Sequence, residues 1–283
     1  MMLEYLISFF TYIFIYMIIV VSFNISFGFT GLVNLGHMVF FGIGAYASAL
    51  MTLHGIPWYI SIIAAALVSS LIGIVIAAIT VRLKGDYFQI VTLGLVFIAI
   101  AVSRNWESLT RGARGLPGVP AIINSNFWYM IFVGITAILC IIFSHWLTGS
   151  ETGKIFQAIR DDETATAILG KNTYLYKVAS IAISTFFVAI AGSLFVHFIR
   201  YVDPTIFDLE FFVLMLIMLI GGGLASVKGS VIGVLVIGTL ADATRFVQFN
   251  PEVVGAFRQM LLMGLLLVIL IYRPRGMFGK VDV

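Results

Sequence analysis

The chain has 283 residues, of which 61% are hydrophobic and only 10% are charged, and its mean hydropathy is +1.11. Values this high exclude a water-soluble globular protein and indicate a polytopic membrane protein. The formal net charge of +3 does not indicate nucleic-acid binding, because the basic residues gather at the ends of apolar segments, where they set membrane topology.

Apolar segments long enough to cross a bilayer recur along the whole chain. A membrane-spanning helix needs about 20 such residues, so we expect an all-α polytopic membrane protein with about eight or nine transmembrane helices in one domain, residues 1–283. The first segment lacks the basic start and cleavage pattern of a signal peptide, and we interpret it as a retained, lipid-facing helix. The expected segments are residues 5–27, 32–53, 58–81, 88–104, 127–147, 178–200, 211–227, 229–249 and 254–272.

The second segment combines glycines with polar residues. Glycines in membrane helices let backbones approach closely or break the helix, and polar groups at membrane depth often mark a transport route. We therefore name Asn34, His37, Gly42 and Gly44 as candidates for lining a translocation path. For His37 we favour the alternative, a histidine hydrogen-bonded between packed helices, and Asn34 has the alternative role of capping a helix.

Two glycine-rich stretches resemble each other weakly. They are GLVNLGHMVFFGIG, from Gly31, and GLASVKGSVIGVLVIG, from Gly223. Gly-interrupted segments in corresponding halves of a transporter are typical of inverted repeats, so the pattern is a candidate inverted repeat. Gly221 to Gly223 are expected to end or break the helix before the second stretch.

Two turns lie between the early segments. RLKGDYFQ, from Arg82, is expected to be a cytoplasmic turn in which Gly85 makes the bend and Asp86 caps the next helix. Residues 105–126 form a longer polar stretch whose prolines, Pro117 and Pro120, exclude a continuous helix. We place this stretch on the opposite side of the membrane.

The longest polar interruption is the 149–177 loop. Acidic residues open a short run that closes on Gly170, which predicts an N-capped helix ending at a left-handed glycine. Such a short helix does not persist alone in water, so its apolar face needs a surface, either this chain's own helix ends or another protein's groove. The residues assigned to this docking helix are Arg160, Asp161, Asp162, Glu163, Ala165, Ile168, Leu169 and Gly170.

The next span contains a candidate close-packing site. Gly192 and Ser193 lie in the middle of the span, where small residues let helices approach. His197 and Arg200, near its outer end, are expected at the membrane interface. Further along, Asp242 and Arg245 are three residues apart and can pair on one helix face.

Sequence motifs for chemistry are missing from the chain. It contains no GxxxxGK[ST] phosphate loop, no HExxH or other metal spacing, and no GxSxG nucleophile motif. We therefore expect a chain that is not an enzyme by itself.

Several separated stretches resemble the permease subunits of bacterial ATP-binding-cassette importers of the branched-chain amino acid group. These stretches are TGLVNLGHMVFFGIGAYASA (residues 30–49), RLKGDYFQIVTLG (82–94), GLPGVP (115–120), GKIFQAIRDDETATAILGKN (153–172), GGGLASVKGSVIG (221–233) and YRPRGMFG (272–279). Their number and order make the resemblance specific. It departs from the family at Thr164 and Thr166, where the family is richer in alanine.

The resemblance implies an ABC importer permease fold and a set of partners. The 149–177 loop would be the cytoplasmic coupling loop, whose short helix sits in a cleft of a separate ATPase subunit that uses ATP and Mg. This chain itself would need no cofactor. A sister permease or a second copy, an extracellular or periplasmic solute-binding protein and membrane lipid complete the expected set, in a bacterial or archaeal cytoplasmic membrane. The implied substrates are leucine, isoleucine and valine, although relatives handle urea, amides or other amino acids.

The importer interpretation gives the outer loops a candidate role. The 105–126 stretch, with Glu107, Arg111 and Arg114, and the acidic connection YVDPTIFDLE, residues 201–210, are candidate contacts for the solute-binding protein. The alternative for residues 105–126 is a solvated connector.

Two other classes of function stay open. An ion-driven secondary transporter needs acidic groups within the membrane, and Asp242 is the convincing candidate for one. A membrane-embedded enzyme needs polar residues clustered at one depth, and the sequence shows no such cluster. Neither alternative gives the 149–177 loop a role.

Overall fold

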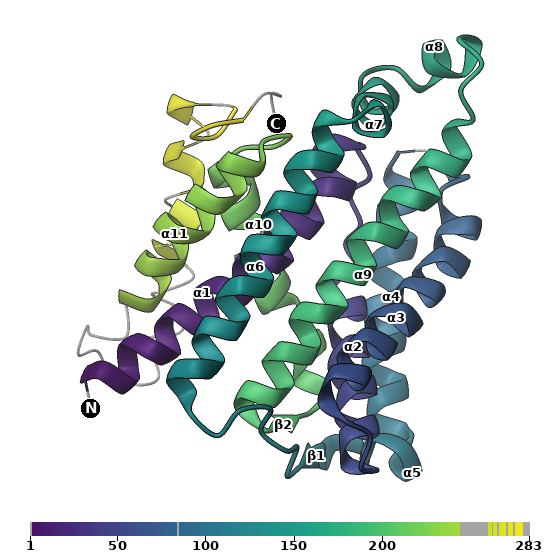
Figure 1. The fold of residues 1–283 in the computed structure, drawn as a ribbon. Helices are drawn as coiled ribbons and strands as arrows, with labels where there is room; N and C mark the ends of the chain where they lie inside the picture. Colours follow the sequence, from purple (N-terminus) through teal and green to yellow (C-terminus); the bar gives the residue numbers. More distant parts are fainter. Residues whose placement is uncertain are drawn as a thin grey trace.

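The computed structural model describes residues 2–83 and 85–243, and near the C-terminus residues 260–261, 263–264, 266–269, 271–273 and 275–279. Long helices dominate it (Figure 1). In chain order the elements are α1 (Met2–Asn24), the π-helix η1 (Ile25–Phe29), α2 (His37–Leu53), α3 (Trp58–Thr80), α4 (Asp86–Asn105), α5 (Glu107–Thr110), η2 (Gly112–Arg114), β1 (Leu116–Pro117), α6 (Asn126–Gly149), α7 (Glu151–Asp161), α8 (Glu163–Ile168), α9 (Thr173–Ile199), β2 (Tyr201–Val202), η3 (Pro204–Phe207), α10 (Leu209–Gly222) and α11 (Val227–Ala243).

The long apolar helices confirm an all-α, multi-pass membrane architecture. Within the described ranges, five helices are long and apolar enough to cross a membrane: α1 continued by η1, α3, α4, α6 and α9. The helices α2 and α10 are apolar but shorter. The predicted last span, residues 254–272, falls partly outside the described residues, and the inverted repeat stays a prediction.

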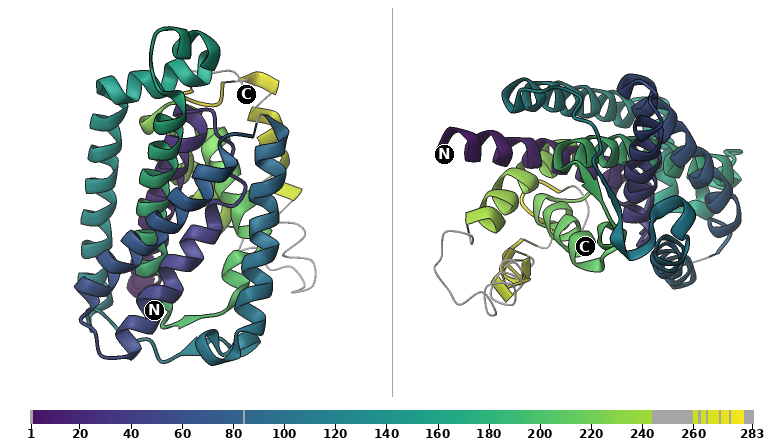
Figure 2. Two further views of the ribbon diagram at one scale, coloured as in Figure 1. Left: turned by 90° about the vertical axis from the view of Figure 1, so that its right-hand side faces the viewer. Right: turned by 90° about the horizontal axis from the view of Figure 1, so that it is seen from below.

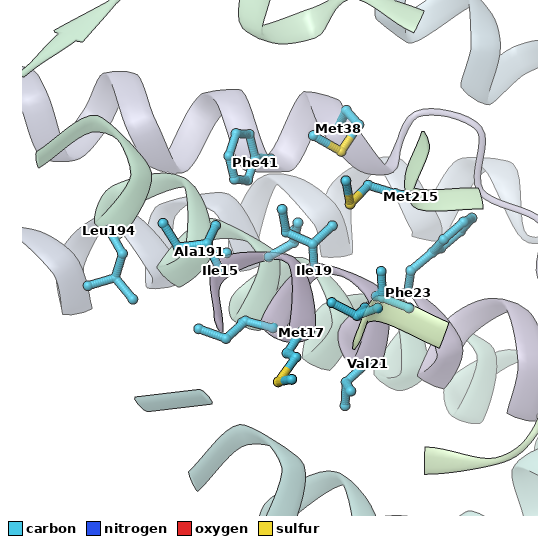
Figure 3. Packing of buried hydrophobic residues seen from close by; sticks show 14 of the residues in the cluster. Ile15, Met17, Ile19, Val21, Phe23, Met38, Phe41, Ala191, Leu194 and Met215 are labelled. Atoms are coloured by element: carbon cyan, nitrogen blue, oxygen red, sulfur yellow. The ribbon is translucent and has the colours of Figure 1, made fainter. Parts of the chain in front are cut away.

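The first helix, α1, packs against other helices along most of its length, so the expectation of a lipid-facing helix is wrong for that part, whereas Leu6 and Phe10 near its start are exposed. It contacts α6, α9, α10 and α11, and the view from below shows it running between α6 and the α10–α11 pair (Figure 2). Its side chains from Met17 to Asn24 are all buried. In Figure 3, Ile19 and Phe23 lie among Met38 of α2 and Met215 of α10. The contacts of α1, rather than its apolar composition, place it in the core, because other membrane helices of the chain are as apolar but more exposed.

Close backbone approach joins α2 to α9. A Cβ added at Gly44 would lie 2.4 Å from the carbonyl oxygen of Ala189, and one at Gly192 would lie 2.0 Å from the carbonyl oxygen of Phe41. The Ser193 hydroxyl donates to the carbonyl of Gly44 over 3.1 Å. The predicted close-packing site at Gly192 and Ser193 is therefore confirmed, with α2 as the partner helix.

The two ends of the bundle are different in structure. At one end, which we call the loop end, α7 and α8 project beyond the long helices (Figure 1). At the other, the ladder end, β1 and β2 form an antiparallel pair in which Leu116 faces Val202 and Pro117 faces Tyr201. The two polar stretches placed on the outer side, 105–126 and 201–210, thus meet in one surface.

His197 is part of this ladder end, at the outer end of α9, and its depth relative to the membrane stays a prediction. The ring is only 2% exposed. Its Nε2 lies 3.0 Å from the Ser48 hydroxyl of α2, and its Nδ1 lies 2.9 Å from the carbonyl oxygen of Pro120. A buried polar ring keeps both nitrogens paired, so His197 ties the 105–126 stretch to two membrane helices.

Basic residues occur at both ends of the bundle, as expected for residues at the ends of apolar segments. Lys154 and Arg160 lie on α7, and the Arg82 guanidinium stacks over the Tyr174 ring at the start of α9, 5.3 Å from its centre. Arg111, between α5 and η2, and Arg114 of η2 precede β1 at the ladder end. Four basic residues lie outside the described residues: Lys84, Arg245, Arg258 and Lys280. The predicted Asp242–Arg245 pair therefore lies outside them too. Asp242 itself accepts a hydrogen bond from the Tyr5 hydroxyl.

Two predicted helix boundaries have different outcomes. The helix α10 ends at Gly222 and is followed by Gly223 with φ of +117°, so the predicted break is confirmed. The helix α4 begins at Asp86, with Gly85 as the residue before it and no side-chain cap. The prediction that Asp86 caps α4 is wrong, because Asp86 already lies in the first turn, where its charge favours the helix dipole.

Candidate functional site

The 149–177 loop folds into two short helices, α7 and α8. The Ser150 hydroxyl caps α7 by accepting a hydrogen bond from the Gly153 amide over 3.3 Å. Phe156 and Ile159 turn inward, at 0% and 4% exposure, and α7 contacts α6, η1 and α9. The Phe156 ring meets Tyr176 of α9 edge to face, with centroids 6.3 Å apart. This apolar face fixes α7 on the loop end of the bundle.

The second helix, α8, begins and ends as the sequence predicts. The Asp162 carboxylate accepts a hydrogen bond from the Ala165 amide over 2.9 Å, which makes Asp162 the N-cap. At the other end Gly170 has φ of +79°, the left-handed geometry of a glycine cap. Local side-chain chemistry thus fixes both ends of a helix that has few bundle contacts.

The apolar side chains of α8 point away from the bundle. Ile168 and Leu169 are 80% and 79% exposed, and Ala165 is exposed as well. The residue that turns inward is Thr166, at 4% exposure, and its hydroxyl donates to the Asp162 carbonyl over 2.8 Å. Among the described residues, no helix end of this chain covers Ile168 and Leu169, so the second expected surface, a groove of another protein, is the one left open.

An ion pair ties the start of α8 to α9. Lys177 Nζ lies 2.5 Å from Glu163 Oε2, and the Thr173 hydroxyl donates to Glu163 Oε1 over 3.3 Å. Lys177 is 8% exposed, whereas the Glu163 side chain is 45% exposed. Because water reaches the carboxylate, the pair contributes little to stability and mainly orients α8.

Arg160 joins α7 to the end of the first membrane helix. Its Nη1 donates to the carbonyl oxygen of Gly28 in η1 over 3.0 Å, while Nε and Nη2 donate to Asp161 Oδ1 over 2.9 and 2.8 Å. The stem of Arg160 also packs on Gly31, where an added Cβ would lie 3.0 Å from its Cγ. Asp161 holds the guanidinium in the orientation that reaches η1.

A polar cleft of about 610 Å³ separates α8 from the bundle. One wall is formed by residues 159–164, and the other by residues 30–33 together with Leu83, Gly85, Phe88 and Gln89. Within the described ranges, no group of three histidine, cysteine, aspartate or glutamate side chains is placed to hold a metal ion. The hydrogen-bond donors Arg160 and Lys177, which line this cleft, bond to other segments of the chain.

The polar path candidates are buried in helix contacts. The Asn34 carbonyl Oδ1 accepts from the Gly36 amide over 3.1 Å, so its side chain shapes the turn before α2. His37 is 1% exposed; its Nε2 lies 3.2 Å from the Ser22 hydroxyl, and its ring stacks on Phe23 with centroids 4.8 Å apart. This is the geometry of the structural alternative, and a role in a path stays a prediction.

The glycine path candidates face other elements of the same chain. A Cβ at Gly42 would lie 2.0 Å from the Phe207 ring of η3, and Gly44 approaches α9 as described above. Close packing against other elements therefore explains why both positions are glycine. Their part in a translocation path stays a prediction.

Asn24 and the π-helix after it are not among the features predicted from the sequence. Asn24 is fully buried at the end of α1 and hydrogen-bonds to residues of the α10–α11 turn. The signal was a polar side chain inside an apolar span. The π-helix gives no signal in the sequence, because its backbone geometry depends on side chains of α9 far along the chain.

Comparison with known proteins gives one consistent result. The profile of a family described as "Branched-chain amino acid transport system / permease component" matches residues 5–270. The high-affinity branched-chain amino acid transport system permease protein LivM of Escherichia coli (strain K12) is 27% identical, over 93% of this chain and 67% of the relative. The probable LivM of Methanocaldococcus jannaschii is 24% identical, over 94% and 91%, and LivH of Salmonella typhimurium is 24% identical, over 95% and 92%.

Proposed function

The chain belongs to the family of branched-chain amino acid transport permeases, and from this premise we propose that it serves an ATP-binding-cassette importer for leucine, isoleucine and valine. In this proposal two ATPase subunits hydrolyse ATP with Mg, a sister permease or second copy completes the path, and a solute-binding protein outside the membrane delivers the amino acid. The location is the cytoplasmic membrane, with the loop end inside.

The exposed pair Ile168 and Leu169 is the observation that carries the proposal. Burying a side chain of this size is worth about 1.5–3 kcal/mol, so two of them at about 80% exposure favour a partner with an apolar groove. Amphipathic helices dock into grooves in this way. The Asp162 and Gly170 caps hold the pair in place before the partner arrives, which lowers the entropy cost of docking.

The packing of the loop supports a mechanical role. A force applied to α8 passes to α7, because one residue separates the two helices. The buried Phe156 and the Arg160 guanidinium then carry it to α9 and η1. Movement of an ATPase subunit would reach the membrane helices through these contacts.

The ladder end supports contact with the solute-binding protein. The β1–β2 pair joins the 105–126 and 201–210 stretches, and the Tyr201 hydroxyl donates to the Arg114 carbonyl over 3.0 Å. His197 of α9 anchors the same surface through its bond to the Pro120 carbonyl. A firm outer platform of this kind suits a protein that must dock and release repeatedly.

The test is co-purification of the ATPase subunit with variants of this chain. Ile168→Asp places a charge on the exposed apolar face and is expected to abolish recovery of the ATPase. The matched control is Leu109→Asp, the same change at a 40% exposed leucine at the ladder end. Undiminished ATPase recovery with Ile168→Asp would overturn the coupling assignment.

Substrate class is tested separately with the assembled transporter. Uptake of labelled leucine is expected to require ATP and to be competed by isoleucine and valine. Competition by urea, amides or other amino acids instead would assign a different solute to the same importer class. Uptake without ATP would favour the ion-driven alternative, in which Asp242 is the first residue to substitute.

A further inference from the structure

The first membrane helix changes from an α-helix to a π-helix at Ile25. Such segments are rare and frequently occur at functional sites. Its altered hydrogen bonding is completed by side chains: the carbonyl of Ile25 accepts from Thr30 Oγ1 over 2.9 Å and from Ser180 Oγ of α9 over 3.3 Å. The hydroxyl of Ser184 donates to the carbonyl of Ser22 over 2.8 Å. Because buried backbone groups in a membrane need partners, α9 stabilises η1 in this form.

Gly28, in the middle of η1, contacts two distant parts of the chain. Its carbonyl accepts the hydrogen bond from Arg160 of the 149–177 loop. Its Cα faces the other way: an added Cβ would lie 1.8 Å from Asn24 Oδ1 and 2.6 Å from the backbone nitrogen of Ala225. Only glycine leaves room for this approach.

Asn24 holds the 223–226 turn, which connects α10 to α11. Its Nδ2 donates to the Ser226 carbonyl over 3.1 Å and to the Ser230 hydroxyl over 2.7 Å, and its Oδ1 accepts from the Ala225 amide over 3.1 Å. Ala225 has φ of +56°, a conformation that costs an alanine free energy. Such strain persists only where the surroundings impose it, and the bond from the Ala225 amide to Asn24 is one contact that helps to hold it.

The end of α10, directly before this turn, is held by residues near the C-terminus. The amides of Met277 and Phe278 donate to the carbonyls of Gly221 and Gly222 over 3.0 and 2.9 Å. The 223–226 turn therefore lies between η1 and residues 275–279. A shift of η1 would move this turn together with the residues that are bonded next to it.

We propose that Asn24 is a positioning residue that relays movement of the 149–177 loop, through Arg160 and Gly28, to the 223–226 turn and the helices α10 and α11. The relay rests on the importer function proposed above, since only a docked ATPase drives the loop. The structure supplies the physical contacts at each step: Arg160 to η1, η1 to Asn24, and Asn24 to the turn. Contacts alone do not prove that two sites are coupled, so the test measures how transport changes when the contacts are removed.

The test uses the assembled transporter, with its ATPase, partner permease and binding protein, in liposomes. Ser230→Ala removes one bond of Asn24, and Asn24→Ala removes all three. The control is Tyr129→Phe, which deletes another buried interhelical hydrogen bond, from the Tyr129 hydroxyl to the Leu194 carbonyl, near the ladder end. The readout is the amount of solute taken up per ATP hydrolysed, because a loss of folding alone lowers both quantities together.

The expected result is a fall in solute taken up per ATP of about fivefold with Ser230→Ala, the size of one buried hydrogen bond, and a larger fall with Asn24→Ala. Tyr129→Phe is expected to keep the wild-type ratio. If Ser230→Ala and Asn24→Ala also keep it, the relay is wrong. Failure of the importer function looks different: in that case the wild-type chain recovers no ATPase or takes up solute without ATP.

A second measurement stays decisive if Asn24→Ala does not assemble. Spin labels at the exposed positions Lys171 and Lys228 report the distance between the 149–177 loop and the start of α11. In the wild type we expect the distance distribution to change between the nucleotide-free and ATP-trapped states, and in Ser230→Ala to change less. Identical responses in both chains would overturn the relay.

Discussion

The guanidinium of Arg160 donates to the carbonyl oxygen of Gly28 over 3.0 Å, so the polar loop of this permease ends on the last turns of its central helix. The contact connects residues 132 positions apart in sequence. It also explains why the Arg160 side chain is only 15% exposed, although its neighbours Asp161 and Asp162 are exposed. Arg160 therefore contacts another part of its own chain and does not belong to the exposed apolar face formed by Ile168 and Leu169.

Replacing Arg160 is expected to separate ATPase binding from transport. Arg160→Met keeps the stem against Gly31 but loses the bond to Gly28, so the ATPase should still co-purify while uptake per ATP falls about fivefold. Lys154→Met is the control, since Lys154 is an exposed cation on the same helix. Equal ratios for the two variants would show that the Gly28 contact carries no coupling.

The cap of α8 is expected to depend on glycine at position 170. Gly170→Val forces a β-branched residue into the left-handed region, at a cost of about 1–2 kcal/mol, and should weaken ATPase recovery and increase proteolysis near Lys171. Gly149→Val is the comparison, because Gly149 has open space around it and no positive φ. Similar proteolysis of both variants would contradict the cap.

The contact of α2 with α9 is expected to be intolerant of a methyl group. Gly44→Ala places a Cβ 2.4 Å from the Ala189 backbone and should destabilise the bundle by about 1–3 kcal/mol, measured as a lower midpoint in thermal unfolding in detergent. Gly94→Ala in α4 has no atom within 4 Å of the new Cβ and should leave the midpoint unchanged or raise it. A stable Gly44→Ala variant would overturn the packing argument.

The ladder end is expected to loosen when His197 is replaced. His197→Leu loses the bonds to Ser48 and Pro120, so the 105–126 stretch should become more sensitive to protease added from the outer side. His54→Leu provides the matched change, since His54 is exposed and bonds only to the nearby Leu50 carbonyl. Protease protection equal to the wild type in His197→Leu would mean that other contacts hold the stretch.

His37 is expected to act through packing rather than through solute contact. His37→Leu removes the bond to Ser22 and should lower the yield of folded protein, with uptake per folded chain and solute preference unchanged. The reference is Phe97→Leu on α4, at a 57% exposed position where the change removes little packing. An altered preference among leucine, isoleucine and valine would place His37 in the path.

Local features of this fold could be predicted from the sequence, because their causes lie within a few residues. The Asp162 cap and the Gly170 end of α8 follow from side-chain and backbone chemistry over one helical turn. The small pair Gly192 and Ser193 likewise marks a close contact in any membrane helix. For such features the residue type alone is informative.

Long-range features could not be predicted in the same way. The central helix α1 and the more exposed α4 are both apolar, and lipid is as apolar as a protein core, so hydropathy does not rank helices by burial. His197 is buried only because Ser48 and the Pro120 carbonyl, distant in sequence, supply its partners. For the same reason Asn24 and η1 were missed, since their meaning depends on α9 and the 223–226 turn.

The burial of Asn24 also sets an order for how this protein is made. The helix α1 is synthesised before the other described helices, and the partners of its asparagine, Ser226 and Ser230, come 202 and 206 residues later. During translation α1 therefore enters the bilayer with a polar side chain whose final hydrogen bonds do not yet exist. The hydrogen bonds of Asn24 form only after α10 and α11 have entered the bilayer, so the packing of α1 is completed late relative to its own insertion.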